Sequence, residues 1–167
     1  RISDHLPKTQ KYLPKQRLWY IRANEVLISS GSIERPLVFG NNDTPGVMLS
    51  SAAKEYMKVY GVLVGKKPLI FTNNDSGYET AIEFKKNGVN PLILDTRKEP
   101  SSDIINEAKN LNIEIKFSHV VVAAKGYKKV KSADISKISD DKKELSKIVN
   151  IECLSLIHIS EPTRLVS

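Results

Sequence analysis

Two turns carry the residues whose types and spacing could serve nucleotide chemistry. The first is residues 72–77, Thr-Asn-Asn-Asp-Ser-Gly, between an apolar run and an amphipathic stretch. A turn in this place holds a dinucleotide pyrophosphate when glycines let the backbone approach and the following helix points its N-terminus at the phosphates. Against the pattern G-x-G-x-x-G only Gly77 is a glycine, and Thr72 and Asn74 replace the other two. The fingerprint is degenerate.

Further features of this turn disfavour phosphate binding. Asp75 would bring a negative charge close to the pyrophosphate. Ser76 and Glu79 have the S-x-x-E spacing of a capping box, which engages the free N–H groups of the helix. Asp95 follows the next apolar run about where a ribose-binding carboxylate belongs. Because the glycines are missing, we interpret Asp95 as a solvated strand-end residue, with ribose binding as the alternative.

The second turn ends the apolar run at residues 26–28 and reads Ser29, Ser30, Gly31. Small residues at the end of a buried strand let the backbone approach a bound cofactor. These three are therefore the candidate cofactor-binding residues. A strand that simply turns at Gly31 is the alternative, and composition does not separate the two.

The sequence contains no catalytic or metal-binding constellation. His5 and His119 are isolated, and Cys153 is the single cysteine. Metal ligands normally cluster, so we expect no metal site. One cysteine also forms no intrachain disulfide, which fits a cytoplasmic protein. Tyr56 and Tyr60 share one face of a predicted helix, and we expect them to be core residues.

The elements that must position these residues alternate between strand and helix. Strands are predicted at 69–72, 92–94 and 113–117, with helices from the turn to about 87 and at 102–111. This βαβ alternation predicts an α/β fold with a Rossmann-like (FAD/NAD(P)-binding) parallel sheet. Residues 119–124 and 130–138 predict an appended antiparallel β-ribbon. Two short strands within 17–31 and a helix at 49–60 that stops at Gly61 complete the prediction.

Composition limits the partners. Hydrophobic residues make up 40% and charged residues 27%, as in ordinary globular proteins. The net charge of +7 raises the question of nucleic acid. The local lysine excess at 125–147 is mixed with acidic residues and few aromatics, so we expect a solvated lysine-rich face and no nucleic-acid binding. No apolar run is long enough for a membrane span. The chain begins with Arg, which suggests truncation.

Three segments, in order and spacing, resemble the α subunits of heterotetrameric sarcosine oxidases. They are residues 26–39 (VLISSGSIERPLVF), 42–49 (NDTPGVML) and 71–78 (FTNNDSGY). The resemblance runs from about His5 to Cys153. It implies a glutathione-reductase-like flavoprotein with an incomplete two-domain architecture. Residues 1–39 would be the late part of a first dinucleotide-binding domain, 40–137 an inserted second domain of that fold, and 138–153 a return segment.

The resemblance also implies cofactors and partners. The subunit would bind NAD, through a fingerprint that precedes Arg1, and share FMN with a β subunit that carries FAD; γ and δ subunits and folate would complete the complex. That complex demethylates sarcosine to glycine, with hydrogen peroxide and a folate-bound one-carbon unit as products. Ser29, Ser30 and Gly31 stand where relatives usually carry Ala-Thr-Gly beside the cofactor. The fragment alone is expected to be inactive. A related flavin-dependent amine or opine dehydrogenase subunit and a non-catalytic interaction module are the alternatives.

The C-terminal residues depart from this resemblance. After Cys153 the family would continue with Asp, an apolar strand and a Ser-Gly-Gly turn. Instead, residues 154–164 read LSLIHISEPTR, which resembles a translated sequencing-library adapter. We therefore predict that residues 154–167, including His158, are a non-native tail outside the fold, with a natural, divergent tail as the alternative.

Overall fold

The computed structural model describes residues 18–29, 34–139 and 146–159. The chain divides into two units, Arg1–Gly31 and Ser32–Ser167. In the first unit, residues 18–29 form neither helix nor strand and are all exposed. The two strands predicted within 17–31 are therefore wrong over these residues. The described part of this unit offers no partner strand, so its apolar side chains, such as Trp19 and Leu27, face solvent.

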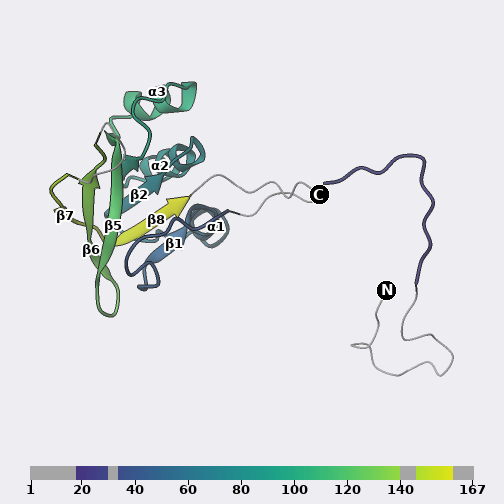
Figure 1. Ribbon diagram of the computed structural model, residues 1–167, viewed down its shortest axis with the longest axis horizontal. Helices are drawn as coiled ribbons and strands as arrows, with labels where there is room; N and C mark the ends of the chain where they lie inside the picture. The colour runs from purple at the N-terminus through teal and green to yellow at the C-terminus, as the bar shows by residue number, and fades with distance from the viewer. Residues whose placement is uncertain (1–17, 30–33, 140–145, 160–167) are drawn as a thin grey trace. The chain divides into compact units, whose positions relative to one another are not determined.

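The main sheet of the second unit contains five parallel strands in the order β1-β8-β2-β3-β4 (Figure 1). The βαβ alternation predicted this parallel arrangement, and the α/β fold class is confirmed. The strands of this sheet are β1 (Val47–Leu49), β2 (Pro68–Thr72), β3 (Leu92–Asp95), β4 (Glu114–Phe117) and β8 (Ser155–Ile159).

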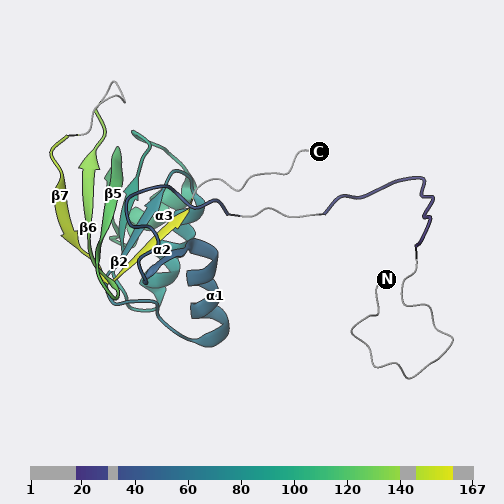
Figure 2. The same cartoon turned by 60° about the horizontal axis from the view of Figure 1, so that its bottom comes forward.

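Three helices cover one face of this sheet (Figure 2). They are α1 (Ser50–Tyr60), α2 (Ser76–Lys86) and α3 (Asp103–Asn110), and all three confirm predicted helices. α1 stops at Gly61, which has a φ of 63° and donates its N–H to the carbonyl of Tyr56. This left-handed end is the reason for a glycine here. None of the described helices is long and apolar enough to cross a bilayer.

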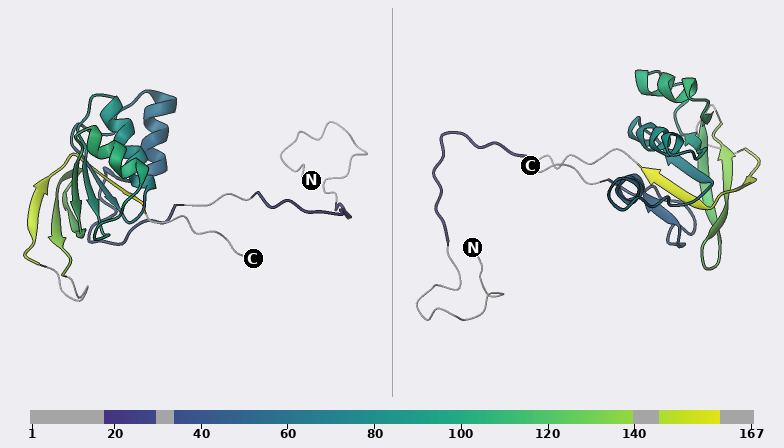
Figure 3. Two further views of the ribbon diagram at one scale, coloured as in Figure 1. Left: turned by 90° about the horizontal axis from the view of Figure 1, so that it is seen from above. Right: turned by 180° about the vertical axis from the view of Figure 1, so that it is seen from behind.

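The opposite face is covered by a second sheet (Figure 3). Its antiparallel strands, in order, are β5 (His119–Gly126), β6 (Val130–Lys137) and β7 (Val149–Glu152). The predicted ribbon is confirmed as β5 and β6. It belongs to a separate sheet, completed by β7, which the sequence did not predict.

The core has two layers because successive side chains of a strand point to opposite faces. Ile70, Ile93 and Ile157 pack against the helices. Leu69 and Leu156 pack against the second sheet. A parallel sheet covered on both faces needs such continuous apolar strands, and every residue of β2 and β8 is buried.

The structure corrects the prediction that residues 154–167 lie outside the fold. Ser155–Ile159 form β8, which pairs with β1 on one side and with β2 on the other. The physical reason is that this segment carries the apolar side chains of Leu156, Ile157 and Ile159, which a central strand needs. The non-native origin of the tail remains a prediction, and residues 160–167 lie outside the described part.

Tyr56 and Tyr60 are not core residues, contrary to expectation. Their exposed fractions are 46% and 64%, and their rings pack on each other at 5.9 Å between centroids. Helix α1 turns Ala53 and Met57 toward the core instead. The apolar stripe of α1 is wider than the face it buries, which a periodicity argument does not reveal.

Candidate functional site

The carboxyl ends of β2 and β3 lie beside the N-terminus of α2, where open parallel sheets bind ligands. β2 ends at Thr72 and β3 at Asp95, which are register partners. Both residues are fully buried. Residues 73–75 connect β2 to α2, so the turn lies where the sequence predicted the dinucleotide position.

The turn is held by its own side chains. The Thr72 hydroxyl donates to the Asn74 carbonyl at 2.9 Å and accepts the Asn74 N–H at 3.1 Å. The Asn74 side-chain oxygen accepts the Ser76 N–H at 3.1 Å and the Ser76 hydroxyl at 2.6 Å. The predicted capping box is therefore wrong. Its Glu79 points away and pairs with Lys54 at 3.1 Å.

Gly77 is required by the close approach of α2 to β2. A Cβ on Gly77 would lie 2.6 Å from the Thr72 Cβ and 2.7 Å from its Oγ1, well inside van der Waals contact. Gly77 therefore performs the helix–strand packing task of the last glycine in the dinucleotide fingerprint. The two glycines that would admit a pyrophosphate are absent.

Asp95 is not solvated, which corrects our interpretation from sequence. It is 0% exposed. The Tyr78 hydroxyl donates to its Oδ2 at 2.7 Å. Arg97 donates its backbone N–H to Oδ1 at 2.9 Å and a guanidinium N–H to Oδ2 at 2.8 Å. Both carboxylate oxygens are thus engaged by protein donors, as a buried charge requires.

Arg97 links two carboxylates. It also pairs with Asp75 at 2.8 Å, and the two acids raise its pKa above the ordinary value. Burial alone raises the pKa of Asp75, but the favourable interactions with Arg97 and Ser102 outweigh burial and hold that pKa below its ordinary value. Burial, then the bond to Asp95, raise the pKa of Tyr78. We call Asp75, Tyr78, Asp95 and Arg97 the Asp95 cluster.

These residues do not fit a dinucleotide. A pyrophosphate needs free N–H groups at the start of α2. The Ser76 N–H is bonded to Asn74, and the Tyr78 N–H is bonded to the Asp75 carbonyl at 3.0 Å. A ribose needs a free carboxylate, whereas Asp95 is closed by Arg97 and Tyr78. The charges of the cluster, two anions and one cation, also oppose a phosphate.

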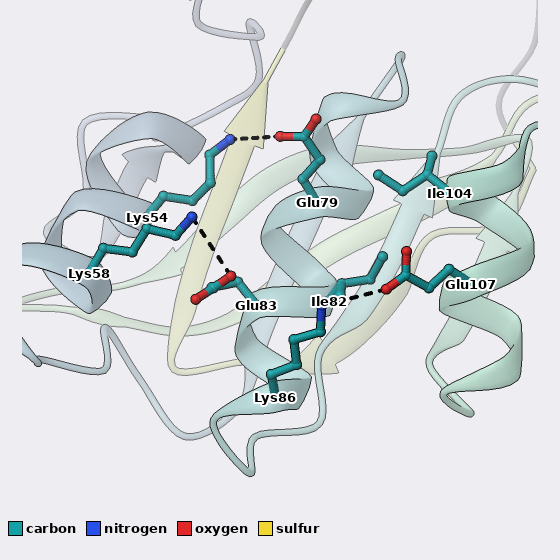
Figure 4. A pocket seen from close by; sticks show the side chains of 8 residues that line it. All are labelled: Lys54, Lys58, Glu79, Ile82, Glu83, Lys86, Ile104 and Glu107. Atoms are coloured by element: carbon teal, nitrogen blue, oxygen red, sulfur yellow. Dashed lines mark hydrogen bonds and ion pairs between the residues drawn. The ribbon is translucent and has the colours of Figure 1, made fainter.

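A shallow groove of about 270 Å³ crosses the outer surface of the three helices (Figure 4). Its charged side chains are paired in rungs, Lys54 with Glu79, Lys58 with Glu83, and Lys86 with Glu107. Each cation is neutralised by a carboxylate of a neighbouring helix. This pattern stabilises helix packing modestly and provides no unpaired acid or base for chemistry.

The remaining candidates from the sequence lie apart from the Asp95 cluster. Ser29 is exposed, and Ser30 and Gly31 lie outside the described residues, so the candidate cofactor contact is untested. Burial, with a smaller contribution from Glu152, raises the pKa of the Cys153 thiol to about 11. Cys153 is therefore an inert core thiol at neutral pH.

Sequence reasoning missed Tyr78 and Arg97 as partners of Asp95. The spacing Asp-x-Arg, with an arginine two residues after a strand-end aspartate, was the available signal. The sequence-based prediction also set His158 aside as part of the tail. In the structure the Nδ1 of His158 accepts the Leu37 N–H at 2.9 Å. Burial lowers the pKa of His158, and the charge of Glu34 partly opposes this shift.

Comparison with known proteins gives three sequence relatives. Sarcosine oxidase subunit alpha of Rhizobium meliloti (strain 1021) is 38% identical over 136 residues, 81% of this chain and 13% of that protein. Sarcosine oxidase subunits alpha of Corynebacterium sp. strains P-1 and U-96 are 37% and 38% identical over 65% and 53% of this chain. The chain thus spans about an eighth of the length of the relative from Rhizobium meliloti. No family model matches.

Solved structures of reductases share the fold. Thioredoxin reductase of T. acidophilum superposes with a TM-score of 0.65 and 18% identity, covering 81% of this chain and 43% of that one. Thioredoxin reductase of Giardia duodenalis gives 0.63 and 19%, covering 79% and 42%. At such low identity these similarities support the fold and leave the chemistry open.

Proposed function

We infer that this chain is a segment of a sarcosine oxidase α subunit and therefore part of an oxidoreductase. The observation that carries the inference is the 38% identity over 136 residues. The fold shared with thioredoxin reductases is consistent with it. The complete complex would demethylate sarcosine oxidatively to glycine, with hydrogen peroxide and a folate-bound one-carbon unit as products.

We propose the following division of the chain. Residues 1–39 are the late part of a first dinucleotide-binding domain, 40–137 the inserted second domain, 138–153 the return segment, and 154–167 a tail of non-native origin. The family is expected to have an apolar strand after Cys153. On this proposal, the run Ser155–Ile159 takes the position of that strand because its apolar pattern satisfies the same neighbours, β1 and β2.

The cofactor assignment follows from the same relationship. NAD would be held by the first domain, with Ser29, Ser30 and Gly31 beside a cofactor, and FMN would lie at the contact with a β subunit. FAD and folate would belong to that partner, and γ and δ subunits would complete the assembly in the cytoplasm. The inserted domain would hold no dinucleotide, since its turn is closed by the Asp95 cluster.

The reading frame upstream of Arg1 provides the first test. A strand followed by G-x-G-x-x-G is expected there, and its absence would refute the proposal. The second test purifies the complete α subunit with its β, γ and δ partners and measures sarcosine-dependent peroxide formation and bound NAD. Ser30→Trp should lower NAD content, whereas Ser51→Trp, on the exposed face of α1, serves as the control. The 167-residue chain alone should oxidise no sarcosine.

A non-catalytic interaction module is the second candidate, and the closed turn at β2 favours it. Co-expression with the β subunit distinguishes the two candidates. An oxidoreductase subunit should associate with its β subunit and retain flavin. Failure to associate would favour the module. Turnover of another secondary amine in place of sarcosine would point to a related flavin-dependent amine or opine dehydrogenase subunit.

A further inference from the structure

The loop that joins β5 to β6 projects beyond the end of the sheets (Figure 1). We call residues 126–131 the hairpin tip. Val130 at its base donates its N–H to the Pro45 carbonyl at 2.9 Å, just before β1 begins. The tip therefore lies at the amino end of the parallel strands, opposite the Asp95 cluster, and the two features are independent.

The tip is a tight, pre-formed turn. Strand pairing continues to the last pair, Gly126 with Val130. Gly126 has a φ of 152°, and a Cβ there would lie 1.9 Å from the Lys129 carbonyl oxygen. Only glycine permits this geometry. The side chains of the tip are thus presented on a fixed backbone, which lowers the entropy lost when a partner binds.

An exposed aromatic and uncompensated lysines occupy this turn. Tyr127 is 91% exposed, and Lys128, Lys129 and Lys131 are exposed. Within the described part of the chain these three lysines form no ion pair, whereas Lys125 at the edge of the tip pairs with Asp134 at 3.1 Å. By contrast, the lysines of the helix surface in Figure 4 are each paired with a glutamate. Positive charge at the tip is left for an external partner.

We propose that the hairpin tip is a docking element for an acidic protein surface that has a recess for Tyr127. Tyrosine is enriched at interface centres because a large ring buries much area at little entropic cost. Lysines around it suit the polar rim, where they steer an acidic partner and speed association. The proposal rests on the tip alone and does not depend on the proposed oxidoreductase role.

Other polyanions fit the tip less well. Nucleic-acid binders contact several phosphates along a groove and stack successive bases. The tip offers three lysines and a single aromatic ring at one point. Stable membrane attachment needs an extended apolar face or a second anchoring signal, and Tyr127 alone supplies neither. A compact acidic protein surface matches the size of the tip.

The experiment places a photo-crosslinking p-benzoylphenylalanine at position 127 of the complete polypeptide, in the cells that produce it. Position 60, an exposed tyrosine on α1, is the matched control. We expect crosslinks from position 127 to one protein, mapped by mass spectrometry to peptides rich in Asp and Glu. With that protein purified, Lys128→Glu/Lys129→Glu should weaken binding at least about tenfold, and added salt should slow association with the unmodified chain.

Lys137→Glu/Lys147→Glu changes the net charge equally, at exposed lysines at the other end of β6, and should leave the affinity within about twofold. Circular dichroism of all variants checks that the hairpin remains folded. The proposal is overturned by crosslinks to nucleic acid or lipid, by equal crosslinking from positions 60 and 127, by the absence of a crosslink, or by binding that both double variants weaken alike.

Discussion

Replacing Arg97 with alanine should destabilise the fold because it removes the counter-ion of a carboxylate that is 0% exposed. Asp95 would keep only the Tyr78 hydroxyl and the backbone N–H of residue 97. Removing one partner of a buried ion pair costs about 3–5 kcal/mol. The Arg97 side chain is 30% exposed, so water partly replaces it, and we expect a loss of about 3 kcal/mol, the lower end of that range.

The assay is urea unfolding of the 167-residue chain at neutral pH, followed by far-ultraviolet circular dichroism. Arg97→Lys keeps the charge but loses the forked hydrogen bonds, so about half the loss is expected. Lys54→Ala breaks an exposed pair and should cost less than about 1 kcal/mol. Asp95→Asn in the Arg97→Ala background should recover stability, because no buried charge then remains unpaired.

The dependence of the unfolding free energy on acidic pH provides a second test of this role. The pKa of Asp75 is depressed in the folded state, so its contribution is present above the unfolded value of about 3.9 and is lost as pH falls through the folded pKa. The difference between the native chain and Arg97→Ala should therefore narrow in that acidic range. Two results would refute the role given to Arg97. One is a loss of unfolding free energy in Arg97→Ala no greater than that in Lys54→Ala. The other is a difference in unfolding free energy between the native chain and Arg97→Ala that does not change with pH.

Other perturbations test neighbouring parts of the structure. Gly77→Ala should lower the free energy of unfolding by about 1–3 kcal/mol through overpacking against Thr72, measured by urea unfolding; a neutral effect would contradict the close approach of α2. Cys153 should react with Ellman's reagent at mildly alkaline pH only as fast as the chain unfolds, because the residue is 2% exposed and burial raises its thiol pKa to about 11; rapid native labelling would contradict this. His158 has a lowered pKa, so the unfolded chain takes up the proton first and stability should fall as pH drops below about 6.5; His158→Gln should flatten that slope in pH-dependent melting.

Local periodicity predicted most elements of the second unit. Helices α1, α2 and α3 and strands β2 to β6 follow from apolar spacing and from stop signals such as Gly61. The parallel order follows from the alternation of strands and helices. These features depend on short-range patterns, which a sequence displays directly.

The predictions that the structure contradicts concern residues whose conformation depends on partners distant in sequence or outside the chain. Asp95 was interpreted as solvated because its burial depends on Tyr78, which lies at the start of α2, 17 residues earlier in the chain. The predicted capping box fails because Asp75 is the N-cap of α2, so Ser76 and Glu79 lie one position too far along the helix, and Asn74 accepts the Ser76 N–H instead. For residues 18–29, apolar content alone predicted strands, but a strand exists only where another pairs with it.

Because strands depend on their partners in this way, removing β8 tests whether the main sheet can fold without its second strand. Ser155–Ile159 pair with both β1 and β2, and all five residues are buried. A chain ending at Cys153 would expose the pairing edges of β1 and β2 and remove Leu156 and Ile157 from the two core layers. We expect this truncation to unfold cooperatively below room temperature or to aggregate, in contrast to a chain ending at Ile159.

The identity of those five residues should matter less than their pattern. Val at positions 156, 157 and 159 should keep the fold at a cost of about 0.5–1.5 kcal/mol per substitution, because each Val removes only one methylene group from a buried apolar side chain. Asp at position 157 should abolish it, since an isolated buried carboxylate has no partner there. Calorimetric melting of these variants and of the chain ending at Ile159 checks this expectation: a folded, cooperatively melting truncation at Cys153 would mean that β8 is dispensable and that the tail takes no part in the fold.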